Sequence, residues 1–254
     1  MRRRRQDAGR ATANLRGMDD LDDLRARLDG ATSVCVLTGS GISSESGLPT
    51  FRGVGGLWRT HRVEELASPG GFARDPRLVW TWYNERRLAH KSVEPSAAHV
   101  ALARLEQRAP DFTLATQNVD SLHIRAGSRN VLELHGKLRE AKCTRCDARR
   151  PFDDAFDLDA LEHDGCGGMW RPDIVWFGES LPQDVFGRAR DAAARADLML
   201  VVGTSGFVQP AASLATKRMT KAHVVEINPE ETQLTPHVDV SLRARASDVL
   251  PSLV

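Results

Sequence analysis

The sequence predicts a doubly wound α/β fold built on a mostly parallel sheet, with a smaller second domain formed by insertions. Apolar runs alternate along the chain with amphipathic stretches, which is the pattern of strands joined by helices. Glycines and polar residues follow directly after several of these runs. The chain has 254 residues, enough for one sizeable core and a small second module. In such folds, ligands bind at the carboxyl ends of the strands.

The elements are expected in a regular order. Residues 19–30 carry Leu21, Leu24 and Leu28 at helical spacing and end on a glycine, so they predict the first helix. Residues 34–37 predict the first strand, buried on both faces of the sheet. Further strands are expected in the apolar runs at 112–118, 130–136, 173–177, 197–205 and 222–229, and helices at 97–107 and 186–195.

The first strand leads into a turn that is typical of a phosphate site. Gly39 and Gly41 allow a tight turn, and a helix beginning near Ile42 would present free N–H groups to an anion. Ser40, Ser43 and Ser44 would add hydroxyl donors. Because Ser44 replaces the third glycine of G-x-G-x-x-G, the two glycines alone are also compatible with a plain strand and turn.

Insertions divide the predicted fold into separate parts. Residues 55–94 are rich in tryptophan and arginine and are expected to be helical, and residues 138–170 hold three of the four cysteines. We therefore expect the large α/β domain to comprise residues 19–54, 95–137 and 171–254. Residues 1–18, with four consecutive arginines, are expected to be a basic disordered tail.

Five motifs, in a fixed order, resemble the sirtuin family of NAD-dependent protein deacylases. The first is TGSGISSESGLPTFRG from Thr38, and the match continues to EINPE from Glu226. The resemblance implies a Rossmann-like domain that uses NAD and a small domain that binds zinc. The other four motifs are TQNVDSLH at 116–123, LHG at 134–136, RPDIVWFGE at 171–179 and GTS at 203–205.

The resemblance also implies roles for individual residues. His135 matches the catalytic base, which acts on a ribose hydroxyl once the carbonyl oxygen of acyl-lysine has displaced nicotinamide, and the near-neutral pKa of histidine suits this task. Ile42 would pack against the nicotinamide ring, and Asn118 and Asp120 would hydrogen-bond its amide. The full set of implied NAD contacts is Gly39, Ser40, Gly41, Ile42, Phe51, Arg52, Gln117, Asn118, Asp120, Gly203, Thr204, Ser205 and Asn228.

Thr50 and the stretch WTWYNERR resemble the bacterial and mitochondrial subgroup, class III, that removes acidic acyl groups such as succinyl and malonyl. The match implies that Tyr83 and Arg86 face the end of the acyl-lysine channel, where i, i+3 spacing on a helix lets both hold one carboxylate. Ala67 matches the small residue that leaves room for a longer acyl chain. Taken alone, Arg86 is also compatible with a solvated helix face. The substrate peptide is expected to add a strand beside Val175, Phe177 and Gly178.

The zinc motif of the family is altered in this chain. Cys143 and Cys146 form the usual first C-x2-C pair, whereas the second pair reads His163 and Cys166. A Cys3His set keeps the ligand spacing and suits a structural tetrahedral zinc ion. The alternative is that the metal is lost and His163 is a solvated loop residue. Cys35 is expected to be a small buried hydrophobe, and no disulfides are expected.

The predicted function is that of an NAD-dependent protein-lysine deacylase, favouring succinyl- and malonyl-lysine and retaining some deacetylase activity. A general deacetylase and a protein mono-ADP-ribosyltransferase or NAD hydrolase are the alternatives. Acylated-lysine proteins are the expected partners. The formal net charge of +1 argues against binding to nucleic acid or a membrane surface. No apolar run approaches a membrane span, so a cytoplasmic location is expected, and the undecided oligomeric state is compatible with a monomer.

Overall fold

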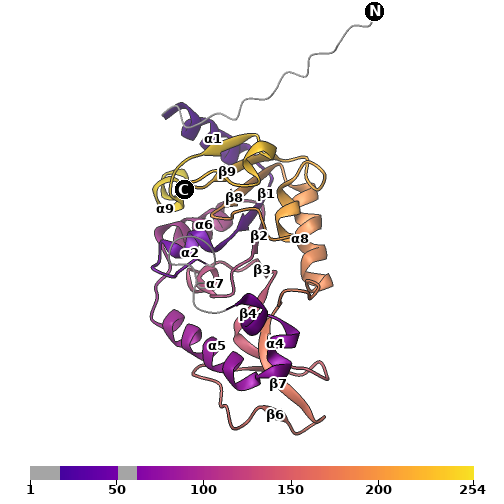
Figure 1. The fold of residues 1–254 in the computed structure, drawn as a ribbon. Coiled ribbons are helices and arrows are strands. Elements are labelled where there is room, and N and C mark those ends of the chain that lie inside the picture. The colour runs from indigo at the N-terminus through magenta and orange to yellow at the C-terminus, as the bar shows by residue number, and fades with distance from the viewer. Residues whose placement is uncertain (1–17, 51–61) are drawn as a thin grey trace, which may run out of the picture.

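The computed structural model describes residues 18–50 and 62–254 and confirms the predicted fold class. Figure 1 shows a larger part around one sheet and a smaller part beyond the end of that sheet. The large sheet is wholly parallel, in the order β10-β9-β8-β1-β2-β3. The strand order reverses beside β1, which places the expected ligand crevice there. Its strands are β1 (Ser33–Thr38), β2 (Asp111–Thr116), β3 (Val131–Glu133), β8 (Leu198–Val202), β9 (His223–Ile227) and β10 (Val240–Leu242).

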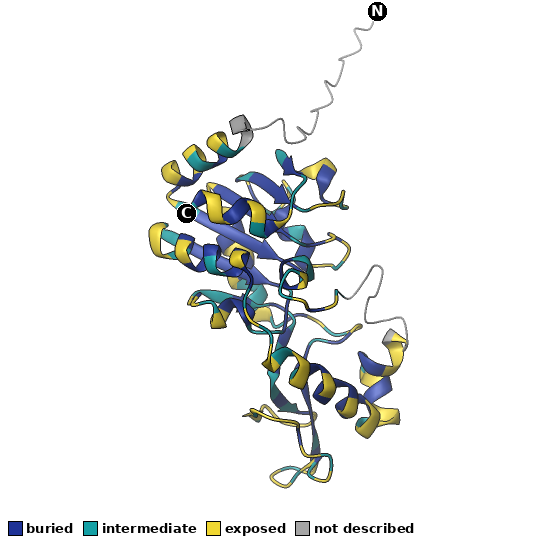
Figure 2. Ribbon diagram, turned by 90° about the vertical axis from the view of Figure 1, so that its left-hand side faces the viewer, coloured by how far each residue is buried: buried dark blue, intermediate teal, exposed yellow. Residues whose placement is uncertain are grey.

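Helices cover both faces of this sheet. Along β1, Val34 and Val36 face one core cluster, while Cys35 and Leu37 face the other. The first cluster is covered by α1 (Met18–Gly30), α6 (Ala97–Arg108), α9 (Ala246–Val249) and the 3-10 helix η4 (Leu250–Leu253). The second is covered by α8 (Gln183–Arg195) and the 3-10 helix η2 (Ala211–Ala215). In Figure 2 the strands are accordingly buried and the outer faces of the helices exposed.

The smaller part joins a helical segment to a second sheet, whose order is β5-β4-β7-β6. A third core cluster, which includes Trp80 and Trp176, packs these elements together. The helices are α3 (Val63–Leu66), α4 (Pro69–Arg74) and α5 (Pro76–Lys91), and the strands are β4 (Gly136–Cys143), β5 (Arg149–Pro151), β6 (Glu162–His163) and β7 (Gly168–Ile174). The remaining short helices are α2 (Ser40–Ser44), α7 (Leu122–Arg125) and η3 (Thr235–His237).

The apolar run at 173–177 differs from its expected place in the fold. Residues 171–174 end β7, which pairs antiparallel with β4 in the second sheet rather than joining the parallel sheet. The run is apolar because Ile174 and Trp176 pack into the third core cluster. An apolar run in the sequence indicates that the segment is buried, but it does not indicate which of two sheets the segment joins.

Two of the predicted features lie outside the described residues. These are the basic tail, apart from its last residue, and the pair Phe51 and Arg52. Among the helices of the described part, none is long and apolar enough to cross a bilayer.

Candidate active site

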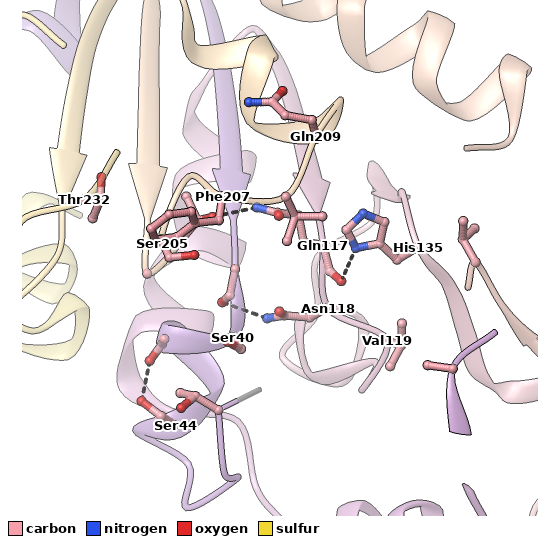
Figure 3. Close-up of a pocket in the computed structure, with 18 of the residues that line it drawn as sticks. Ser40, Ser44, Gln117, Asn118, Val119, His135, Ser205, Phe207, Gln209 and Thr232 are labelled. Carbon is pink, nitrogen blue, oxygen red and sulfur yellow. Dashed lines mark hydrogen bonds between the residues drawn. The ribbon is translucent and has the colours of Figure 1, made fainter. Parts of the chain in front are cut away.

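A cavity of about 1080 Å³ lies between the two parts of the molecule. It opens at the carboxyl ends of β1, β2, β8 and β9 and extends to α5 and to the loop after β7. Figure 3 shows part of its lining. The predicted site residues that line it are Gly39, Ser40, Gly41, Ala67, Tyr83, Arg86, Gln117, Asn118, His135, Val175, Phe177, Gly178, Gly203, Thr204, Ser205 and Asn228.

The glycines that follow β1 allow its backbone to lie in close contact with the backbone at the end of β8. The Gly39 N–H donates to the Val202 carbonyl at 3.0 Å, and the Gly41 N–H donates to the Gly203 carbonyl at 2.8 Å. A Cβ on Gly41 would lie 2.7 Å from the Gly203 Cα, so a side chain there would force the segments apart. These two N–H groups are therefore used within the chain, and the predicted anion donors remain the N–H groups of the helix that follows. The Ser44 hydroxyl also donates within the chain, to the Gly41 carbonyl at 2.7 Å.

Asn118 and Asp120 belong to one buried hydrogen-bond network. The Asn118 Nδ2 donates to the Gly39 carbonyl and to the Ser43 Oγ, both at 3.0 Å. The Ser43 hydroxyl in turn donates to the Asp120 Oδ2 at 2.7 Å. Burial raises the pKa of Asp120, and its hydrogen bonds oppose that rise. Asp120 lines a smaller cavity of about 20 Å³, which it shares with Ser40, Asn118 and Arg86.

His135 is partly buried and lies at the junction of the two sheets, between β3 and β4. Its Nδ1 lies 3.0 Å from the Gln117 carbonyl oxygen, as Figure 3 shows. A carbonyl has no proton to donate, so Nδ1 carries the proton and the neutral ring presents Nε2 as a base. Burial lowers the pKa of His135, and the hydrogen bond to Gln117 partly opposes this. The imidazole is therefore unprotonated at neutral pH, as a general base requires.

The part of the cavity beside α5 is lined by an aromatic residue and a cation. Tyr83 and Arg86 are both buried, and the Arg86 Cζ lies 4.4 Å from the Trp82 ring centroid. The Tyr83 hydroxyl oxygen accepts a hydrogen bond from the Trp176 Nε1 at 3.0 Å. Burial raises the pKa of Tyr83 to about 12 and lowers the pKa of Arg86 to about 10. At neutral pH the phenol therefore keeps its proton and the guanidinium keeps its charge.

The opposite end of the cavity is a cluster of amides and hydroxyls. The Gln117 Nε2 donates to the Thr204 Oγ1 at 2.8 Å, and the Asn228 Nδ2 donates to the Thr204 carbonyl at 3.2 Å. Ser205 lies beside them in the lining. This polar end suits the hydroxyls and phosphates of a nucleotide.

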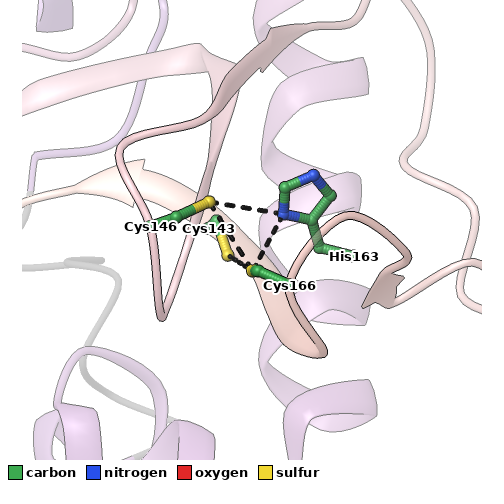
Figure 4. A group of neighbouring side chains, drawn as sticks. All are labelled: Cys143, Cys146, His163 and Cys166. Carbon is green, nitrogen blue, oxygen red and sulfur yellow. Dashed lines mark hydrogen bonds between the residues drawn. The ribbon is translucent and has the colours of Figure 1, made fainter.

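The four predicted zinc ligands converge on one point of the second sheet (Figure 4). Their ligand atoms all lie within 4.8 Å of one another. The Cys143 and Cys166 sulfurs are 3.4 Å apart, and the His163 Nδ1 is 3.5 Å from the Cys146 sulfur. Thiolates that bind one tetrahedral zinc at about 2.3 Å are separated by roughly 3.8 Å, so the Cys3His set fits the ion. None of the four lines the large cavity, so zinc here is structural.

Two predicted contacts involve residues that are already engaged within the chain. Ile42 is fully buried in the core of the large sheet and lines neither cavity, and its contact with nicotinamide stays a prediction. Along the predicted peptide strand, the Val175 N–H donates to the His135 carbonyl and the Phe177 N–H to the Ala67 carbonyl. A bound peptide would therefore have to pair with the other groups of this segment.

Several residues of the cavity could not be found from the sequence. Trp82 and Trp176 lie next to predicted residues in the chain, and their aromatic character was the only signal. Phe207 and Thr232 follow the GTS and EINPE motifs, but nothing in their spacing indicates a ligand. Arg245 enters the lining from the C-terminal region, where no motif was recognised.

Comparisons with a family sequence model, with curated proteins and with solved structures all point to the same protein family. A sequence model of the Sir2 family matches residues 39–210. The chain is 50% identical over 220 residues to "NAD-dependent protein deacylase 1" of Archaeoglobus fulgidus, which covers 86% of this chain and 90% of that protein. A solved Sir2 homologue in complex with NAD has a TM-score of 0.87 at 45% identity and covers 96% of this chain and 94% of its own. A mutant Sir2 homologue with 2'-O-acetyl ADP ribose has a TM-score of 0.84 at 46% identity and covers 91% and 94%. The chain belongs to the Sir2 family.

Proposed function

We propose that the chain is an NAD-dependent protein-lysine deacylase that transfers the acyl group to ADP-ribose and releases nicotinamide. The observation that carries the proposal is that His135, Gln117 and Asn118 line one large cavity together with the buried side chains of Tyr83 and Arg86. The general activity is supported by a relative that is named a deacylase and by homologues solved with NAD and with 2'-O-acetyl ADP ribose.

The residues of the cavity suit each step of such a reaction. The carbonyl oxygen of acyl-lysine bonds to the ribose carbon as the bond to nicotinamide breaks. The side-chain amide of Asn118 and the carboxyl of Asp120 suit the carboxamide of the departing nicotinamide, because the Ser43 hydroxyl hydrogen-bonds to both and fixes their positions. His135 then accepts a proton from a ribose hydroxyl through Nε2, while the Gln117 carbonyl keeps the proton on Nδ1. The ribose oxygen bonds to the acyl carbon, the bond from that carbon to the lysine nitrogen breaks, and water adds at the same carbon, which leaves acyl-ADP-ribose and free lysine. The polar end around Thr204 would hold the rest of the nucleotide.

The finer proposal is that the enzyme favours succinyl- and malonyl-lysine over acetyl-lysine. Arg86 brings a positive charge into a largely buried part of the cavity, and Tyr83 lies three residues earlier on the same helix. The Tyr83 oxygen accepts the Trp176 N–H, which leaves its own proton to be donated to a substrate. A terminal carboxylate would accept a charge-assisted hydrogen bond from each group, whereas an acetyl methyl group can accept none.

One incubation tests the reaction class. The enzyme is given NAD and the same peptide carrying either acetyl- or succinyl-lysine, and peptide and nucleotide products are identified by mass spectrometry. We expect deacylated peptide together with acyl-ADP-ribose. Free ADP-ribose with unchanged peptide, or ADP-ribose attached to protein, would instead place the chain among NAD hydrolases or ADP-ribosyltransferases.

A further inference from the structure

The loop that carries Asp120 contains an unusual backbone conformation. Ser121 has a φ of +65°, and it is the only non-glycine residue with positive φ in the described parts of the chain. This conformation lets the Leu122 N–H turn back and donate to the Asp120 Oδ1 at 2.9 Å, while the Ser43 hydroxyl binds Oδ2. Non-glycine residues adopt this region at a cost, so surrounding contacts have to hold Ser121 in place.

Those contacts come from an ion pair that joins the two sheets. The Arg139 Nη1 donates to the Ser121 Oγ at 2.5 Å. The same guanidinium binds both carboxylate oxygens of Glu133, each at 2.7 Å. Glu133 ends β3 of the parallel sheet, and Arg139 lies on β4 of the second sheet. The Leu138 N–H also donates to the Val119 carbonyl at 3.0 Å, which keeps β4 beside this loop.

The ion pair between Glu133 and Arg139 also affects the electrostatic environment of the Asp120 carboxyl. The Glu133 side chain is 7% exposed, and its negative charge adds to the effect of burial in raising the pKa of Asp120. Arg139 is bound to both Glu133 oxygens and offsets this charge. Without Arg139, Ser121 would lose a hydrogen bond and Asp120 would face an uncompensated carboxylate.

We propose that Glu133 and Arg139 are positioning residues, which hold Ser121 in its left-handed conformation and so orient the Asp120 carboxyl in the small cavity that it shares with Asn118 and Ser40. This inference rests on the proposed function, in which Asp120 contacts the carboxamide of nicotinamide. The pair is expected to act on NAD handling, because the Asp120 carboxyl and the Asn118 amide both hydrogen-bond to the Ser43 hydroxyl, whereas Tyr83 does not line the small cavity that holds Asp120.

The test is a double-mutant cycle between Arg139 and Ser121. The change under test combines Arg139→Met with Glu133→Gln, and it is made in the wild-type chain and in Ser121→Gly. Glu133→Gln is included because Arg139→Met alone would leave the Glu133 carboxylate buried and unpaired. The measured quantities are the KM for NAD, the rate of nicotinamide exchange, the KM for acyl-peptide and the midpoint of thermal unfolding. Arg149→Met is the control, because this arginine lies on the same sheet with an exposed side chain.

In the wild-type background we expect the KM for NAD to rise about tenfold and nicotinamide exchange to slow, with the KM for peptide within about twofold. In Ser121→Gly the same change should raise the KM for NAD less than about threefold, because glycine adopts positive φ without support. An equal rise in both backgrounds, or an unchanged KM for NAD, would overturn the inference.

Asp120→Asn separates this inference from the proposed function. If Asp120→Asn raises the KM for NAD while Arg139→Met does not, only the positioning role is wrong. If Asp120→Asn leaves both the KM for NAD and nicotinamide exchange unchanged, the assigned role of Asp120 is wrong, and the positioning role is overturned with it.

Discussion

A single hydrogen bond decides which nitrogen of His135 can act as a base. The Gln117 carbonyl holds the proton on Nδ1, so Nε2 carries the lone pair. The LHG motif identified His135 from the sequence, but the partner that sets its tautomer is a backbone oxygen and leaves no trace in residue identity. The buried partner of Tyr83, Trp176, was likewise not predictable, because it depends on packing between α5 and the loop after β7. The contact of Arg86 with Trp82, by contrast, joins residues at i, i+4 on one helix.

At neutral pH His135 is expected to be fully active as a base. Burial lowers its pKa below the ordinary 6.5, and a base works when it is unprotonated. The kcat/KM for acyl-peptide should therefore stay level as the pH falls from 8 to about 6.5 and decline only below that value. His135→Ala should lower kcat/KM by about 10²-fold to 10⁴-fold. His237→Ala, an exposed histidine, is the control, and an acid limb centred above pH 7 would contradict the assignment.

At the scale of elements, the crevice lies where β1 and β8, which are parallel neighbours in the sheet, end side by side. Gly39, Gly41 and Gly203 bring the ends of these strands into backbone contact. The sequence predicted the strands and the glycine turn correctly because apolar runs and glycines report burial and close approach. It missed the place of residues 171–174, because a short apolar run does not reveal whether its partner is parallel or antiparallel.

Gly41→Ala should therefore destabilise the fold as well as impair NAD binding. Its Cβ would meet backbone atoms of Gly203 at 2.7 Å, which cannot move aside as a flexible side chain would. We expect a loss of about 1–3 kcal/mol in the free energy of unfolding, measured by denaturant titration. Gly187→Ala in α8 is the matched control, since nothing lies within 4 Å of its Cβ, and it should stabilise by up to about 1 kcal/mol. Equal stability of the two variants would refute this explanation.

At the scale of the whole molecule, the zinc cluster belongs to the same packed module as the part of the cavity beside α5, although it does not line the cavity. Cys143 belongs to the third core cluster, which also contains Tyr83, Trp82 and Trp176. The ion would therefore hold together the module that carries these cavity residues. The sequence predicted the four ligands from their spacing together with the resemblance to the family's zinc motif, and their convergence confirms that His163 stands with the three cysteines.

Metal analysis should find one zinc ion per chain. His163→Ala should retain less zinc and lower the midpoint of thermal unfolding by roughly 5 °C or more, because the closed tetrahedral site loses a ligand. The control is Asp164→Ala, an exposed neighbour in the same loop, which should keep the metal. A protein that holds no zinc, with His163→Ala as stable as the control, would show that the cluster is not a metal site.

The central claim is that one cleft joins NAD chemistry to recognition of an acidic acyl group, and the acyl preference of Arg86→Met tests it most directly. The kcat/KM for succinyl- and acetyl-lysine forms of one peptide is compared in the wild type, in Arg86→Met and in Arg77→Met, an exposed arginine of the same helix. We expect the wild type and Arg77→Met to favour succinyl. Arg86→Met should lose about 2 kcal/mol, or roughly 30-fold, for succinyl while acetyl changes less than about threefold. An unchanged ratio of succinyl to acetyl turnover in Arg86→Met would contradict the account.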